Sequence, residues 1–231
     1  MLLLFFFVTD VWGEVDEKAV KILERTSAYY QALENFRAVY SLTVHYPELE
    51  ESIVQSSKMV ITVRGQQYRL ACFQQETITD GETIWVHDKE IKEVTISNYA
   101  TTDNSLNFVD LPNIYQQGGY EPIYVREHIV NRKKNKIEDV VQLIPAEDNS
   151  DSNFKSILLE IDRATAQICG WEIIQNEEVK YRCKLSSFAA NIELSDDCFT
   201  FDINAHGLLE VIDLRENENL DDFLDLNLAD E

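Results

Sequence analysis

Residues 58–99 form the stretch that most limits how this chain can fold. Apolar and polar side chains alternate along several short runs, which are separated by turn sequences such as Gly65-Gln66-Gln67 and Asp80-Gly81. A period of two in residues rich in β-branched and aromatic side chains predicts strands with one buried face. Asp-Gly favours a tight hairpin because type I′ turns need a positive φ at both central residues. The stretch is therefore expected to be an antiparallel β-meander whose apolar face covers another sheet, a helix or a ligand.

The flanking segments add a helix and more strands. Residues 14–35 gather apolar side chains on one helical face and begin with acidic residues, which suit the positive end of the helix dipole, so an amphipathic helix is predicted. Residues 36–46 change to a period of two and predict a long first strand. The chain is therefore expected to be mainly β, of the α+β class. Further strands are expected at 120–130, 139–144, 156–161, 168–175 and 179–188, and a turn with a last short strand at 191–201.

Residues 100–119 interrupt the β pattern. They carry spaced apolar residues and end at Gly118-Gly119, which predicts one or two short helices. Leu111 precedes Pro112, and this biases Leu111 away from the helical region. The residues alone leave two interpretations open, a lid over an apolar site or a plain connection at one end of the sheet.

Acidic residues outnumber basic ones by 42 to 20, which gives a formal net charge of −22. Such a chain repels phosphate backbones and anionic lipid headgroups, so nucleic acid is not expected as a partner. Residues 126–136 are the exception, with five basic side chains, whereas acidic residues concentrate in 210–231. The basic turn at 132–136 and the acidic tail are two candidate docking surfaces.

The two ends of the chain differ from its middle. Residues 2–8 are an unbroken apolar run, too short for a bilayer, which needs about 20 residues, and they fit the apolar core of a secretory signal peptide over residues 1–13. A hydrophobic N-terminal strand is the other interpretation. Residues 216–231 are expected to be an acidic tail or a short helix, which leaves 14–215 as the folded domain.

No arrangement of residues in the sequence indicates catalysis. The His and Cys residues lack metal-ligand or redox spacing, and phosphate-binding, dinucleotide-binding and nucleophile motifs are missing. His87-Asp88 is expected to be an exposed turn. Cys169 and Cys183 lie on the two strands of one expected hairpin, and a disulfide between them is left open. We expect a protein without enzyme activity, cofactor or metal, exported to bind an apolar ligand.

Six segments in order resemble the LolA family of periplasmic outer-membrane lipoprotein carriers, in the form found in Bacteroidetes. Together they cover about residues 18–215. They read KAVKILERTSAYYQALENFRAVYSLTV, VRGQQYRL, ITDGETIWVHDKEIKEVTISNY, DLPNIYQQG, ILLEIDRATAQICGWEII and FTFDINAHGLLEVIDLR.

The resemblance implies an unclosed antiparallel β-barrel covered by the N-terminal helix and short lid helices, with an apolar space that holds acyl chains. The family takes acylated lipoproteins from an inner-membrane ATP-binding cassette transporter that releases them. It carries them through the periplasm to an outer-membrane acceptor without covalent chemistry. This protein is then expected to be a monomeric periplasmic chaperone. The alternative is a stationary lipid- or lipopolysaccharide-sensing periplasmic module of the same fold.

The resemblance also suggests site residues. In the family a strand arginine hydrogen-bonds to the lid backbone and holds it shut, and Arg69 stands at that position. The period of two leaves another placement open, because Tyr68 and Leu70 facing inward put Arg69 on the outer face. Each residue expected at the acyl cavity is equally an ordinary core residue. These are Leu42, Val44, Ile61, Val63 and Trp85 on strands, and Leu111, Ile114 and Tyr115 on the lid.

Overall fold

The computed structural model of the protein describes residues 16–46, 53–99, 109–131, 136–146, 149, 154–175 and 179–215. The expected signal peptide, the acidic tail and positions 132–135 of the basic turn lie outside these residues. The boundaries expected for the folded domain at 14 and 215 stay predictions.

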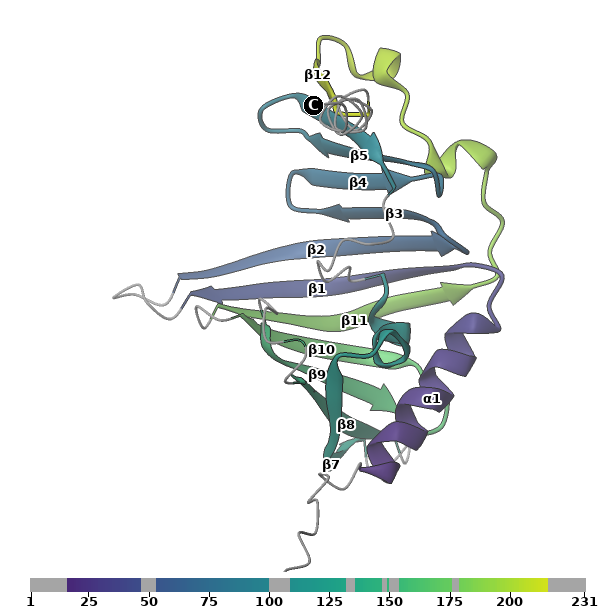
Figure 1. Ribbon diagram of the computed structural model, residues 1–231, viewed down its shortest axis with the longest axis vertical. Coiled ribbons are helices and arrows are strands. Elements are labelled where there is room, and N and C mark those ends of the chain that lie inside the picture. The colour runs from purple at the N-terminus through teal and green to yellow at the C-terminus, as the bar shows by residue number, and fades with distance from the viewer. Residues whose placement is uncertain are drawn as a thin grey trace, which may run out of the picture.

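Twelve strands form one twisted sheet, and the expected meander over residues 58–99 makes up most of one half of it (Figure 1). Neighbouring strands are antiparallel, except that β12 runs parallel to β6. The order across the sheet is β12-β6-β5-β4-β3-β2-β1-β11-β10-β9-β8-β7. Because β7 and β12 end the sheet without pairing with each other, the sheet is an unclosed barrel, and the predicted fold class is confirmed. The strands are β1 (Phe36–Tyr46), β2 (Ile53–Arg64), β3 (Gln67–Cys72), β4 (Gln75–Thr79), β5 (Thr83–Asp88), β6 (Glu93–Asn98), β7 (Tyr120–Asn131), β8 (Lys136–Pro145), β9 (Phe154–Asp162), β10 (Ile168–Gln175), β11 (Lys180–Ala190) and β12 (Glu210–Asp213).

Helix α1 (Glu17–Gln31) packs on one face of the sheet, called the inner face below (Figure 1). The Asp16 carboxylate starts the helix by accepting hydrogen bonds from the backbone N–H groups of Lys18 and Ala19, both at 3.0 Å. The helix is amphipathic, as expected, and one side of it is buried. Its buried residues are Ala19, Ile22, Leu23 and Tyr30, together with the hydroxyl residues Thr26 and Ser27.

The interruption of the β pattern contains η1 (Leu111–Gln117), a short 3-10 helix with Pro112 in its first turn. Gly118 and Gly119 follow it with φ angles of 80° and 75°, a conformation that favours glycine, so the expected helix end is confirmed. Contacts join η1 to α1, which places both on the inner face.

The C-terminal segment differs from the expectation of a last strand at 191–201. The chain instead forms the short helices η3 (Asp196–Phe199) and η4 (Ile203–His206), and the last described strand is β12. The Asp202 side chain accepts a hydrogen bond from the N–H of Asn204 at 2.9 Å and so caps η4. Within the expected strand region the backbone bonds are local instead, because the N–H groups of Cys198 and Thr200 donate to the carbonyl oxygens of Ser195 and Asp197.

Two apolar clusters lie on opposite faces of the sheet. The larger cluster joins α1 and η1 to β1, β2 and the strands from β8 to β11. The smaller one holds Ile78, Val94, Ile96 and Phe201, and lies on the outer face between β4, β5, β6 and the C-terminal segment. α1 and η1 therefore pack on the inner face of the sheet, whereas residues 196–206 pack on its outer face at the end that holds β3 to β6.

Candidate functional site

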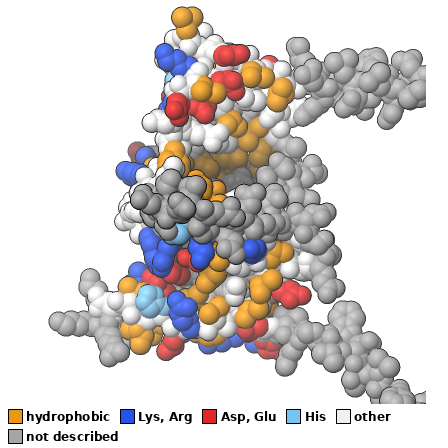
Figure 2. Space-filling view, turned by 90° about the vertical axis from the view of Figure 1, so that its left-hand side faces the viewer, with side chains coloured by type: hydrophobic (Ala, Val, Ile, Leu, Met, Phe, Trp, Pro, Cys, Tyr) orange, Lys and Arg blue, Asp and Glu red, His pale blue; other side chains and the backbone are white. Residues whose placement is uncertain are grey.

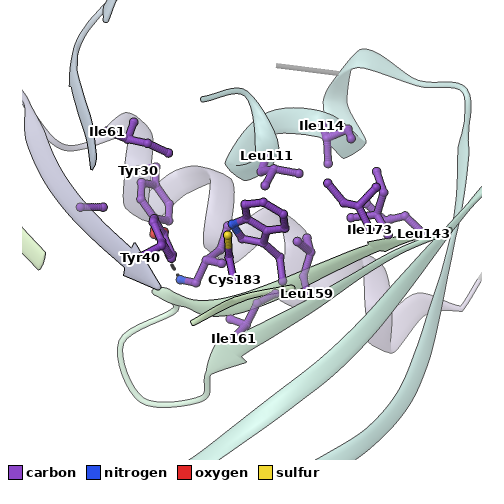
Figure 3. Packing of buried hydrophobic residues seen from close by; sticks show 14 of the residues in the cluster. Tyr30, Tyr40, Ile61, Leu111, Ile114, Leu143, Leu159, Ile161, Ile173 and Cys183 are labelled. Carbon is purple, nitrogen blue, oxygen red and sulfur yellow. Dashed lines mark hydrogen bonds between the residues drawn. The ribbon is translucent and has the colours of Figure 1, made fainter. Parts of the chain in front are cut away.

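The candidate site is the apolar space between the inner face of the sheet, α1 and η1. Figure 3 shows Leu111 and Ile114 of η1 on the side of the sheet residues Leu143, Leu159 and Ile173. The structure brings most of the expected cavity residues together in this cluster. Leu42, Val44, Ile61, Val63, Leu111 and Ile114 are all buried, and Tyr115 packs against them.

Neutral hydrogen bonds hold η1 against α1. The Ser27 hydroxyl lies 2.7 Å from the carbonyl oxygen of Pro112 and 2.9 Å from Oδ1 of Asn113, and it has one proton to donate. The Gln31 side-chain amide donates to Oε1 of Gln116 at 2.9 Å and lies 3.3 Å from Oδ1 of Asn113. Sequence analysis missed Ser27 and Gln31. Their spacing of four on one side of the helix was the available signal, but it does not say what they face.

Little free volume remains under η1. A cavity of about 10 Å³ lies among Tyr30, Tyr40, Leu111 and Trp171, which is about the room for one water. A larger hollow of about 210 Å³ adjoins it beside the end of α1 and shares Tyr30, Phe36, Val109 and Pro112 with its lining. Figure 2 shows hydrophobic side chains gathered in a hollow on one face of the molecule. The apolar interior under the described residues of η1 is therefore closely packed.

Asp110 lies at the start of η1, and burial raises the pKa of its carboxyl group. Burial together with the nearby Asp110 charge also raises the pKa of Tyr99. The backbone carbonyl of Asp110 accepts a hydrogen bond from the N–H of Asn113 at 2.8 Å. The start of η1 thus holds a carboxyl group that takes up a proton more readily than an exposed aspartate does.

Arg69 lies on the outer face, the second of the two placements that the alternation left open. Its Nε donates to Oε1 of Glu76 at 2.8 Å and its Nη1 donates to the carbonyl oxygen of Cys198 at 3.2 Å. These partners belong to β4 and η3, whereas η1 lies across the sheet. In this structure Arg69 fastens the C-terminal segment, and the side chains that bond to η1 are those of Ser27 and Gln31.

Trp85 also lies outside the inner cluster, because it packs against the outer cluster with Phe201. His87 lies two residues after Trp85 on β5, on the same face, and is buried. The prediction that His87-Asp88 forms an exposed turn is therefore wrong. The His87 ring lies 5.1 Å from the Phe201 ring and 4.9 Å from the His206 ring. Sequence periodicity shows that Trp85 and His87 share a face, but not which face is the inner one.

All four cysteines are free thiols, so the disulfide between Cys169 and Cys183 that the sequence left open is not formed. Burial raises the pKa of the Cys169 thiol to about 11 and that of Cys183 further, which makes both poor nucleophiles. Within the described ranges, no group of three or more His, Cys, Asp and Glu side chains is arranged to hold a metal ion. The described residues also contain no helix long and apolar enough to cross a membrane.

Comparisons with known proteins agree with this architecture. An uncharacterized conserved protein from Thermus thermophilus superposes with a TM-score of 0.55 at 11% identity, over 85% of this chain and 99% of that chain. The LolA superfamily protein NE2245 from Nitrosomonas europaea gives a TM-score of 0.42 at 12% identity, over 80% and 98% of the two chains. A chain of the Pseudomonas aeruginosa MucA/MucB complex gives 0.42 at 13% identity, over 83% and 63%.

No curated protein sequence matches this chain significantly. A family model described as outer membrane lipoprotein carrier protein LolA matches residues 35–202, from the last residue before β1 to the start of η4. This range is well over half of the chain and includes η1 and nearly all of the inner cluster on the sheet. The protein therefore belongs to the LolA family of outer membrane lipoprotein carrier proteins.

Proposed function

We propose that the protein binds the acyl chains of lipoproteins beneath η1 and carries them through the periplasm from the inner to the outer membrane. The observation that carries this proposal is an apolar interior whose cover, η1, is held to α1 by neutral hydrogen bonds. The transporter that releases the lipoproteins and the outer-membrane acceptor are part of the proposal. Membership of the LolA family supports it.

The energetics suit reversible binding. Acyl chains in water expose dozens of methylene groups, and burying each one gains about 0.8 kcal/mol. The same surfaces of Leu111 and Ile114 that now pack on the sheet can pack on acyl chains after η1 moves outward. A neutral hydrogen bond such as that of Ser27 contributes only about 1 kcal/mol, so the lid exchanges partners at small cost.

A reversible lock on η1 tests the binding site. Ser27→Cys combined with Asn113→Cys places thiols on two facing side chains, whose oxygens are now 2.9 Å apart. The reduced double variant should bind a fluorescent triacylated lipopeptide at least as well as the wild type does, and oxidation should then lower its affinity at least tenfold. A thiol-sensitive mobility shift shows that the disulfide has formed. Binding that survives in this locked form would contradict a site under η1. The single variants Ser27→Cys and Asn113→Cys, treated with the same oxidant, serve as the controls.

A transfer assay tests the carrier role separately. Inner-membrane vesicles that carry labelled lipoproteins are incubated with the protein and ATP, and we expect label in the soluble fraction in complex with the protein. Lipopeptide binding without any release from the vesicles would instead indicate a stationary lipid-sensing module.

A further inference from the structure

Two tyrosine side chains lie in the apolar interior beneath η1, one on α1 and the other on β1. Tyr30 is 7% exposed and Tyr40 is 6% exposed. Both line the small cavity of about 10 Å³ that also touches Ile61, Leu111 and Trp171, and Figure 3 shows the two tyrosines close to Ile61. A buried hydroxyl group needs hydrogen-bond partners inside the protein or on a ligand, because it has lost those that water offers.

The hydrogen bonds of this tyrosine pair leave one hydroxyl proton without an acceptor. The Tyr30 oxygen accepts from the N–H of Ile168 at 3.2 Å, and the two hydroxyl groups are hydrogen-bonded to each other. Each hydroxyl group has one proton to donate, so the bond between them uses one of the two. Within the described part of the chain, neither hydroxyl group donates to any other atom. Burial raises the pKa of both groups, so they stay protonated at neutral pH and offer one donor to a bound molecule.

The surroundings of the pair favour a neutral acceptor. The described side chains that line the small cavity are apolar or aromatic, and none of them is charged. An ionised phosphate or carboxylate would lose its hydration there without gaining a cation, so it is disfavoured. The carbonyl oxygen of an ester or amide carries no charge, and its hydrogen bond is stronger in an apolar site than in water. An ester or amide carbonyl is also the group that joins an acyl chain to its polar end.

The position of the pair suits such a linkage. The neighbouring hollow of about 210 Å³ at the end of α1 shares Tyr30 with the small cavity, and the polar side chains of Gln31 and Asn113 also line it. In the other direction, Figure 3 shows the apolar cluster extending from the two tyrosines past Leu111 towards Ile114. The pair therefore lies where the lining changes from polar to apolar.

We propose that Tyr30 and Tyr40 form a subsite for a ligand carbonyl, to which the pair donates its remaining hydroxyl proton. The acceptor is the ester or amide oxygen at the head of an acyl chain. The chain then lies under η1, and the polar end of the ligand points into the hollow at the end of α1. This subsite rests on the proposed function, because it takes an acylated ligand as given. It adds selectivity for the linkage to apolar contacts that are not directional and accept any alkyl chain.

Two fluorescent lipopeptides test the subsite, one with two ester-linked acyl chains and one with two ether-linked alkyl chains of the same length. The ether keeps the apolar contacts but lacks the carbonyl oxygen. Tyr30→Phe combined with Tyr40→Phe keeps both rings and removes both hydroxyl donors. This double variant should lose about fivefold more affinity for the ester than for the ether, as expected for one neutral hydrogen bond. Tyr29→Phe, at the neighbouring partly buried tyrosine of α1, is the matched control and should change this ratio less than about twofold.

Infrared spectroscopy gives a second measurement, on the wild type alone. An isotope-labelled ester carbonyl of the bound lipopeptide should show a narrow band at lower frequency than in hexadecane, because one fixed donor replaces the many donors of water. Only a broad band as in water or a band at the hexadecane position would overturn the subsite. So would an equal loss of affinity for ester and ether in the double variant, and in each of these cases the proposed function stands. If the wild type binds neither lipopeptide, the proposed function fails and the subsite fails with it.

Discussion

The two covers of the sheet are held in place by different forces. On the inner face α1 and η1 bury a large apolar cluster, and the hydrogen bonds between them come from the uncharged side chains of Ser27 and Gln31. On the outer face the C-terminal segment adds Phe201 to a small cluster, and its Ile203 and Leu209 pack against that cluster. That segment is tied to the sheet by charged groups, with Arg69 bound to Glu76 and to the Cys198 carbonyl.

Because the forces differ, we expect η1 to be able to leave the sheet, whereas the C-terminal segment stays bound to it. Apolar packing is not directional, so the underside of η1 can trade sheet residues for acyl chains of similar polarity. A guanidinium group that satisfies a buried carboxylate and a carbonyl oxygen needs fixed geometry, and losing it leaves Glu76 without its main partner. We infer that the outer cover belongs to the rigid frame, while η1 is the part that moves.

The largest effect is expected at Tyr30, where the inner cover meets the sheet. Tyr30 packs against Phe36 and Phe188, and its hydroxyl oxygen accepts a hydrogen bond from the N–H of Ile168 at 3.2 Å. Tyr30→Ala should lower the free energy of unfolding by about 3–5 kcal/mol, because it leaves a large cavity in the core. Denaturant unfolding measures the change. Tyr30→Phe is the matched control, which keeps the ring and should cost clearly less; an equal loss would show that the hydrogen bond, not packing, dominates.

The outer cover is tested by Arg69→Leu. This change leaves the buried Glu76 carboxylate with Lys89, whose ammonium nitrogen is 3.6 Å away, and should cost about 2 kcal/mol. Hydrogen exchange should accelerate in 196–213 and stay unchanged in 111–117. Faster exchange in η1 instead would restore Arg69 to the role of a lid latch. Arg182→Leu, on an exposed position, is the control and should change neither segment.

Sequence reasoning reached the fold and most of the inner cluster for a physical reason. A period of two fixes which residues share a face, and the meander with its Asp-Gly turn fixes which strands are neighbours. It could not fix which face is the inner one far from α1, and so it placed Trp85 in the cavity. Sequence reasoning also could not identify the polar residues of α1 that bond to η1. Ser27 is an ordinary helix residue until the partner 85 positions away in the chain is known.

The two covers should respond to pH in opposite directions. Burial and the neighbouring His206 and Lys89 lower the pKa of His87, although Glu76 and Asp88 oppose the shift. The unfolded chain then binds more protons, so the stability of the outer cover is present above pH about 6.5 and is lost as pH falls through the folded pKa. For Asp110 burial raises the pKa, so the closed lid is favoured below pH about 3.9 and weakens as pH rises through the folded value.

Hydrogen exchange across pH 4 to 7.5, corrected for intrinsic rates, measures both effects. Lower pH should reduce protection of 201–213 relative to η1, and His87→Phe should remove that dependence. Asp110→Asn should remove the dependence in η1 and leave that of the outer cover. Both segments changing in the same direction would contradict the assignment of His87 and Asp110 to separate covers.

The smallest effect, and the one that bears most directly on the lid, is expected for Ser27→Ala. The variant loses the hydroxyl donor 2.7 Å from the Pro112 carbonyl, which should shift the closed-to-open equilibrium of η1 by about 1 kcal/mol, or about fivefold. The free energy of global unfolding should fall by no more than this ~1 kcal/mol, because the alanine keeps the apolar contacts of the helix. The rate at which a fluorescent lipopeptide enters should therefore rise severalfold. Thr26→Val is the matched control, since the neighbouring buried hydroxyl donates within α1 to the carbonyl of Ile22. Equal acceleration by the two variants would mean that loosening the helix, not releasing η1, controls entry.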